Sequence, residues 1–152
     1  MKILARHLTV DLYNCKSSKL QDMEAIRDAL GKAVEQQGYQ NMDVMEQAAD
    51  GQELFAMVSF QGGHAAVHAF AELRYVALDI FLCEENAEPE GIYRSLQKFF
   101  QPDKTKATLL KRGDFGKERE IKPKTKTSVA PLRKIHNTGA KVIRVLAHRN
   151  RQ

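Results

Sequence analysis

Residues 60–83, FQGGHAAVHAFAELRYVALDIFLC, contain two short apolar segments separated by a polar turn. HAAVHAF (64–70) and YVALDIFLC (75–83) have the length and the apolar and aromatic character of β-strands. Residues 72–74 form the expected turn between them, and the glycines at 62–63 indicate a tight turn before the first strand. This stretch therefore predicts two neighbouring strands joined by a short turn.

Strand patterns also precede the glycine turn. LFAMVSF (54–60) is a compact apolar run that ends at the glycines, and YQNMDVME (39–46) predicts a shorter strand, with an acidic turn at 48–53 between them. ILARHLTVDLY (3–13) alternates apolar and polar residues, which predicts a strand with one buried side. KATLLK (106–111) would be the last strand. The buried residues expected in the first strand are Leu4, Leu8, Val10 and Leu12.

Two segments have the three- and four-residue spacing of amphipathic helices. Before the first helix, Ser18 and Gln21 can form a capping box, and Gly38 fits its C-terminal end. The second helix opens at residues 84–89, with Pro89 suited to the first turn. The expected buried residues are Leu20, Met23, Ile26, Leu30, Ala33 and Val34 in the first helix and Ile92, Leu96, Phe99 and Phe100 in the second.

The predicted order of elements, β-α-β-β-β-β-α-β, interleaves two helices with hairpins. It indicates an α/β (α+β) fold, a two-layer sandwich with both helices on one face of a mainly antiparallel sheet. At 152 residues, the chain is expected to form one domain, at residues 1–113, followed by an extension at 114–152.

The extension differs from the domain in charge. Residues 1–113 carry 13 Lys and Arg against 16 Asp and Glu, a net charge of −3, whereas residues 114–152 carry 11 against 3, a net charge of +8. Residues 117–134 are expected to be a solvated linker, and the apolar segment within 140–149 either docks on a neighbouring surface or stays loose. Any affinity for nucleic acid would therefore lie in the extension.

The chain has no apolar run near the roughly 18 residues of a membrane helix, and its first residues do not have the pattern of a signal peptide. The two cysteines, Cys15 and Cys83, then favour reduced thiols in a cytoplasm. We therefore expect a cytoplasmic protein with no membrane partner.

His64 and His68 lie four residues apart in a predicted strand and therefore face the same side. With Cys83 on the adjacent strand, they could bind zinc, but zinc sites need three or four ligands and no further Cys or His has a recognisable spacing. The glycines could bind an anion, but no phosphate-loop sequence follows them. The residues alone favour a plain turn that enters a strand, with no metal.

Residues 1–113 resemble the bacterial S-adenosylmethionine decarboxylase proenzyme family, in its short, single-repeat form. The resemblance implies an S-adenosylmethionine decarboxylase-like sandwich and a homodimer, with the active sites at or near the dimer interface. The basic extension goes beyond the usual end of the family. The matching features are ARHLTVDLYNC near the start, the long first helix, H-x-x-x-H-x-F-x-E at 64–72, YVALDIFLC at 75–83, and KFFQPDK and LLKRG near the domain end.

The resemblance also implies a pyruvoyl enzyme. Members of the family cut themselves between a Glu and a Ser, and the Ser becomes a pyruvoyl group that forms a Schiff base with the substrate amine. Gly62 and Gly63 stand at the two matching positions. The cut requires a serine oxygen to attack the preceding carbonyl, so no pyruvoyl cofactor is expected at Gly63. Ser59 is four residues away, and its neighbours do not match the motif.

Two further family positions have changed. Phe55 matches a serine that assists processing in the family, and Ala49 matches an aromatic residue that stacks on adenine. His68, which matches a processing histidine, and Cys83, which matches the proton donor of decarboxylation, are retained. Each retained residue also has a purely structural interpretation, His68 as a hydrogen-bonded histidine and Cys83 as a small packing residue.

Three residues are the candidates for ligand binding. Phe70 matches a second aromatic residue of the adenine site, which is usually Trp, and Glu72 matches a residue that lines the substrate pocket of the family. His64 is the retained histidine of the Glu-Ser-His motif. Glu72 could equally be a solvated turn residue.

Three functions stay open on this basis. The first is a homologue without pyruvoyl chemistry (a pseudoenzyme), linked to polyamine (spermidine) metabolism, that binds S-adenosylmethionine, its decarboxylated form or a polyamine, or pairs with an active relative. The second is a working S-adenosylmethionine or amino-acid decarboxylase with another electron sink, although no lysine motif for pyridoxal phosphate is visible. The third is weak nucleic-acid binding through the extension, in which Phe115 is the only Phe, Tyr or Trp for base stacking.

Overall fold

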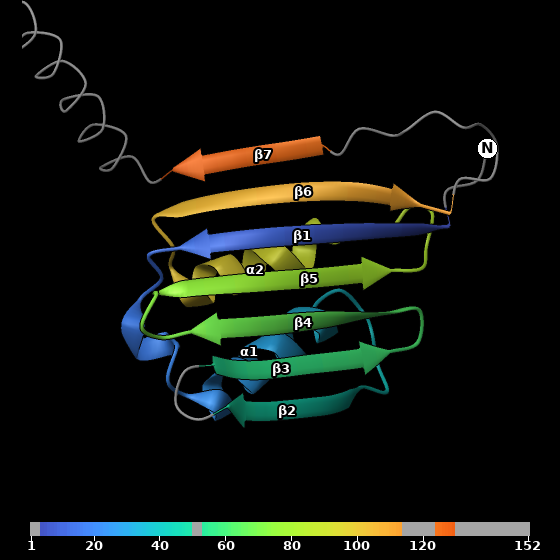
Figure 1. Cartoon of the computed structure of the whole chain (residues 1–152). Coiled ribbons are helices and arrows are strands. Elements are labelled where there is room, and N and C mark those ends of the chain that lie inside the picture. Colours follow the sequence, from blue (N-terminus) through green and yellow to red (C-terminus); the bar gives the residue numbers. More distant parts are fainter. Residues whose placement is uncertain (1–3, 50–52, 114–123, 130–152) are drawn as a thin grey trace, which may run out of the picture.

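The computed structural model describes residues 4–49, 53–113 and 124–129. Within them, a single antiparallel sheet has the strand order β2-β3-β4-β5-β1-β6-β7. Figure 1 shows both helices on the same side of this sheet, which confirms the predicted two-layer α+β sandwich. The elements are β1 (Ala5–Tyr13), η1 (Ser17–Lys19), α1 (Met23–Glu35), β2 (Asp43–Ala49), β3 (Glu53–Phe60), β4 (Gly63–Phe70), β5 (Tyr75–Leu82), α2 (Glu90–Phe100), β6 (Lys104–Arg112) and β7 (Lys124–Val129).

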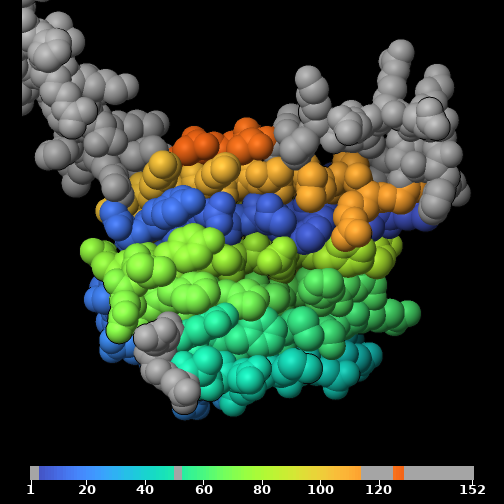
Figure 2. All heavy atoms as spheres, in the orientation of Figure 1, coloured from blue at the N-terminus to red at the C-terminus, as the bar shows by residue number. Residues whose placement is uncertain are grey.

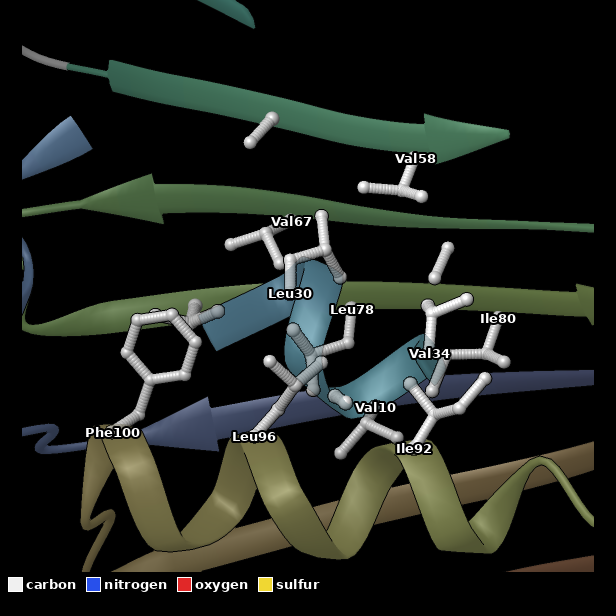
Figure 3. Close-up of a cluster of buried hydrophobic side chains, with 14 of the residues drawn as sticks. Val10, Leu30, Val34, Val58, Val67, Leu78, Ile80, Ile92, Leu96 and Phe100 are labelled. Carbon is white, nitrogen blue, oxygen red and sulfur yellow. The ribbon is translucent and has the colours of Figure 1, made fainter. Parts of the chain in front are cut away.

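The core lies between the helices and one face of the sheet (Figure 3). α1 packs against β3 and β4, and α2 packs against β1 and β5. Because side chains alternate along a strand, every second residue of the central strands is buried, and each large one contributes roughly 1.5–3 kcal/mol. The residues labelled in Figure 3 are Val10, Leu30, Val34, Val58, Val67, Leu78, Ile80, Ile92, Leu96 and Phe100.

The start of α1 differs from the prediction. The Ser18–Gln21 capping box is wrong, because Asp22 caps the helix and its carboxylate accepts the backbone N–H of Ala25 at 3.0 Å. Ser18 lies instead in the short η1 turn. The predicted stop is confirmed, since Gly38 follows the helix with φ +87°, a left-handed backbone that favours glycine.

α2 follows the prediction more closely. Pro89 precedes the first helical residue, and Ile92, Leu96 and Phe100 are buried as expected. Phe99 is only half-buried and packs edge-on against Phe100, with ring centroids 4.9 Å apart. Within the described residues, neither helix is long and apolar enough to cross a membrane.

Two further features, near the start of β1 and in the edge strand β2, differ from the prediction. Leu4, expected to be buried in the first strand, lies before β1 and is 52% exposed. β2 covers residues 43–49 rather than 39–46, and it is exposed along its whole length, as an edge strand can be. The strand therefore extends into the first residues of the acidic turn predicted at 48–53.

The solvated linker predicted at 117–134 is wrong for the six residues of β7, which pair antiparallel with β6. Their sequence, KTKTSV, alternates a basic or small residue with a β-branched one, a pattern that suits a strand with one neighbour. The apolar segment within 140–149 and the rest of the extension lie outside the described residues.

The face of the sheet opposite α1 and α2, called the open face below, has polar and aromatic side chains. On β1, β4 and β5 these are the residues that alternate with the buried ones. Figure 2 shows the strands of this face side by side, with no helix in front of them. The open face is where most of the candidate site residues lie.

Candidate functional site

Strand β4 positions four of the candidate residues. Its residues Ala65, Val67 and Ala69 are buried against the helices, so the alternating residues His64 and His68 face the open side, as predicted. The strand begins at one glycine of the turn and ends at Phe70. The two ends of β4 therefore define two separate clusters, which are described in turn.

At the first end, the chain turns tightly through Gly62, whose φ is +94°. Cys83 follows β5 directly, and its backbone N–H donates a hydrogen bond to the Gly62 carbonyl oxygen at 2.6 Å. The Cys83 thiol is free and exposed. The structure thus places Gly62 and Gly63, the two positions matched to the cleavage motif by resemblance, next to Cys83.

Gly63 is closely surrounded by backbone and side chains. A Cβ added there would overlap the backbone carbonyl oxygen of Phe81 and lie 3.0 Å from Leu82 Cδ2 and 3.1 Å from Phe60 Cε2. Real Cβ atoms do not approach a fixed backbone oxygen so closely, so any side chain at position 63 would require β4 and β5 to move apart.

Gly62 is restricted for a different reason. An added Cβ would meet only Glu84 Oε1, at 3.7 Å, so space is available. Its positive φ, however, costs roughly 1–2 kcal/mol for a residue with a Cβ. The local backbone therefore favours glycine at both positions of the matched Glu-Ser pair.

At the second end of β4, His68 pairs with a carboxylate. His68 Nδ1 lies 2.6 Å from Glu53 Oε1, and both side chains are about one-third exposed, at 37% and 31%. The ring of Phe55, which lies directly opposite on β3, has its centroid 4.7 Å from that of His68. The histidine is thus held between an aromatic ring and an acid.

His68 lines a hollow of about 300 Å³ on the open face. Its walls include Ala49 and Phe55, the two positions matched to a stacking aromatic and a processing serine. The structure therefore places three of the matched positions around one small space. Gln47 and Glu53 complete the lining.

Glu53 was missed by the sequence interpretation, which placed it in an acidic turn. Its partner could have been found from the hairpin, because a turn at residues 61–62 pairs Phe60 with Gly63 and thereby Phe55 with His68. Glu53 then lies two residues along β3, diagonal to His68. The sequence therefore contains the information that places Glu53 near His68, but using it requires knowing the exact length of the turn.

Phe70 belongs to an aromatic row across the open face. Its ring is stacked on Tyr75 with centroids 5.8 Å apart, and Tyr75 contacts Tyr13 at 5.5 Å. Tyr75 Oη donates to Asp11 Oδ1 at 2.6 Å. Burial, together with this hydrogen bond and the nearby charges, raises the pKa of Tyr75 well above its ordinary value. Phe70 is therefore supported by a neutral, anchored tyrosine.

Glu72 lies apart from this row. It is exposed in the turn after β4 and lines a different hollow, of about 400 Å³, together with Gln21 and Ala48. Glu53 lines both hollows and is the only residue that connects them among those described. Phe70 and Glu72 do not line a common hollow in the single chain.

His64 is placed near the glycine end. Its ring stacks on Phe81 with centroids 5.5 Å apart, and Phe81 also meets His7 edge-on at 5.7 Å. His7 Nε2 in turn lies 2.9 Å from Asp79 Oδ1. His64 and His68, four residues apart in a strand, are separated by about 13 Å along it. No group of three or more possible metal ligands occurs in the part of the chain that the structure describes.

The two candidate catalytic residues also lie far apart within one chain. Gly63, beside Cys83, precedes His68 by five residues of strand, or about 17 Å. One chain alone therefore does not assemble His68 and Cys83 into one site.

A family model described as S-adenosylmethionine decarboxylase matches residues 6–113. An S-adenosylmethionine decarboxylase proenzyme of Methanococcus maripaludis strain S2 is 32% identical over 122 residues, which cover 79% of this chain and 100% of that protein. One from Caldanaerobacter subterraneus is 29% identical over 117 residues, covering 77% and 94%.

A solved structure has a similar fold. The crystal structure of an adenosylmethionine decarboxylase from Aquifex aeolicus matches with a TM-score of 0.70 and 19% identity, over 80% of this chain and all of that one. At this identity the likeness concerns the fold. Because the family model covers most of the chain, including β1 to β6 and both helices, the chain belongs to the S-adenosylmethionine decarboxylase family.

Proposed function

We propose that this chain is a member of the family that does not cut itself and acts as a non-catalytic binding or regulatory homologue linked to polyamine metabolism. The observation that carries the proposal is Gly63. It has no hydroxyl to attack the preceding carbonyl, and the surrounding atoms leave no room for a side chain. Position 63 therefore lacks both the hydroxyl that would start the cleavage and the space for a side chain that could carry it.

A pyruvoyl group does not fit this site. It would replace residue 63, and its three-carbon skeleton needs the space that Phe81, Leu82 and Phe60 occupy around Gly63. We therefore derive no catalytic step through such a group. His68 and Cys83 have structural roles that need no pyruvoyl group. The His68 side chain pairs with Glu53, and the backbone N–H of Cys83 donates to the Gly62 carbonyl oxygen.

We also propose a homodimer formed through the open face. The support is that this face carries stacked aromatic rings and paired charges, and that none of the described residues forms a layer over it. A two-fold axis across the sheet would place the Cys83 end of one chain beside the His68 end of its partner. Sedimentation should give a dimer at micromolar concentration, and a monomer would contradict this part of the proposal.

The proposed ligand is S-adenosylmethionine, its decarboxylated form or a polyamine. The hollow beside His68 is at the small end of the range for ligand sites, which is about 300–1,000 Å³, so a partner chain would have to complete it. The carboxylates of Glu53 and Glu72 suit the amines of these ligands. Phe70 supplies the remaining ring for stacking on adenine.

Intact-mass spectrometry of the purified protein tests the central claim. We expect one species with the mass of the whole chain. Two fragments that meet at residues 62–63, with pyruvoyl on the second, would overturn the proposal. The Gly63→Ser variant should also stay whole, because Phe55 offers no helper hydroxyl and Gly62 stands in place of the glutamate.

A further inference from the structure

A groove of about 480 Å³ lies on the helix-bearing side of the sheet, between α2 and the strands β6 and β7. α2 packs over β1 and β5, so the last two strands extend beyond the helix. The groove is separate from the hollows beside His68 and Glu72, with which it shares no residue. It goes beyond the function proposed above.

Part of the groove is built by residues outside the family domain. Lys126 and Ser128 of β7 line one wall, and β7 follows the region that the family model matches, residues 6–113. In register they lie opposite Ala107 and Thr105 of β6. The added strand therefore converts the edge of the domain into a groove with two walls.

The rim of the groove is cationic. Arg6, Arg94, Lys111 and Lys126 line it, against a single carboxylate from Glu90. No ion pair between described residues involves Arg94, Lys111 or Lys126. Several cations without a partner in one concave site attract a compact anion, because the low-dielectric walls concentrate their field.

The floor of the groove is apolar with one hydroxyl pair. Leu8, Ala107 and Leu109 form the apolar part. Tyr93 Oη donates to Thr105 Oγ1 at 3.2 Å, which leaves the hydroxyl hydrogen of the buried Thr105 available for a ligand acceptor. An apolar floor with a few polar groups is the usual composition of a small-molecule site.

We propose that this groove binds a small phosphorylated organic molecule, with the phosphates on the Arg94, Lys111 and Lys126 side and the apolar part on the floor. The volume is within the range for such ligands. Residues 130–152 of the extension are a poor occupant, since they contain six Lys and Arg and no Asp or Glu and would be repelled. Phosphate groups are well matched by arginine and lysine donors.

Calorimetry with ADP, pyrophosphate and adenosine tests the proposal on the full chain. We expect saturable ADP binding, weaker pyrophosphate binding and still weaker adenosine binding, because both the charge and the apolar part contribute. Lys126→Glu and Arg94→Ala should each weaken ADP binding by at least about tenfold, the usual effect of losing a charged contact. Glu90→Gln should strengthen it, since it removes the one opposing charge.

Lys106→Glu is the matched control. Lys106 lies on β6 opposite Thr127, one position from the pair of Ala107 with Lys126, so its side chain faces the other side of the sheet. It makes the same charge change without touching the groove and should leave ADP affinity unchanged. Equal weakening by Lys106→Glu and Lys126→Glu would overturn the site, and so would the absence of saturable binding of ADP and pyrophosphate at about 1 mM. Thermal melts of each variant exclude unfolding as the cause.

Discussion

The two ends of strand β4 differ in what surrounds them. At the Gly63 end, backbone packs directly against backbone, and no side chain fits. At the His68 end, side chains from β3 and β4 pair around a small open hollow. One end of β4, called the closed end below, is therefore closed by backbone packing, and the other, the open end, is lined by side chains around a space.

The largest effect is expected at the closed end. Gly63→Ala should lower the free energy of unfolding by about 3 kcal/mol, because the added Cβ overlaps the Phe81 carbonyl oxygen and two strands must separate. The matched control is Gly31→Ala, where nothing lies within 4 Å of the added Cβ inside α1, and it should stabilise by about 0.5–1 kcal/mol. Chemical denaturation of both variants measures the two values. Equal and small effects would show that the closed end can relax.

The two cysteines should differ by at least about a hundredfold in alkylation rate at pH 8. Burial raises the pKa of Cys15 to about 12, so almost none of it is thiolate, and its side chain is fully covered. Cys83 is exposed at the glycine end. Peptide mass spectrometry after iodoacetamide treatment measures each rate, and both should become equal in urea. Fast alkylation of Cys15 in the native protein would contradict the packing of the core.

The same pKa shift predicts the effect of alkaline pH on stability. Below the ordinary pKa of a thiol, near 9, Cys15 is neutral in both the folded and the unfolded chain, so its contribution to stability is complete. Between pH 9 and pH 12 the unfolded chain ionises first and is favoured, so the free energy of unfolding should fall. Cys15→Ala should flatten this part of the pH profile, and an unchanged slope would remove Cys15 as its source.

At the open end, Tyr75→Phe should lower the free energy of unfolding by about 1.5 kcal/mol, because it removes the hydrogen bond from Tyr75 Oη to the Asp11 carboxylate. The substitution keeps the ring that stacks on Phe70, so ligand affinity should change little. Denaturation measures the change in stability and calorimetry the change in ligand affinity, both on the same sample. A large loss of affinity with no loss of stability would show that the hydroxyl contacts the ligand.

The smallest effect concerns the proposed ligand. S-adenosylmethionine or its decarboxylated form should bind at best in the micromolar range, with no release of carbon dioxide. Because Ala49 offers no ring, stacking is weaker by about 1 kcal/mol, or fivefold, than with two rings. Phe70→Ala should reduce the calorimetric heats, whereas Phe99→Ala, on α2 and away from the hollow, should not. Equal heats for Phe70→Ala and the unchanged protein would mean that this end no longer binds the ligand.

Sequence patterns were sufficient for much of the fold. The apolar, strand-forming segments within residues 54–82 and the three- and four-residue spacing of both helices reflect local residue preferences, and the structure confirms these strands and helices. The start of α1 was predicted wrongly, since Ser18 and Asp22 are both residue types that favour an N-cap and the structure has Asp22 in that position. The strand at 124–129 was missed because an edge strand with few apolar residues resembles a linker until its neighbour is known.

Some features of the candidate site also follow from the sequence, and others depend on the tertiary structure. The sequence by itself determined that position 63 has no hydroxyl and that His64 and His68 share one face, because both follow from residue type and strand periodicity. Only the tertiary structure decided that Gly63 has no room for a side chain, that His68 pairs with Glu53, and that Cys83 lies at the opposite end of β4. These features depend on the register between strands that are distant in the chain, and register is set by turn lengths and by packing against the helices.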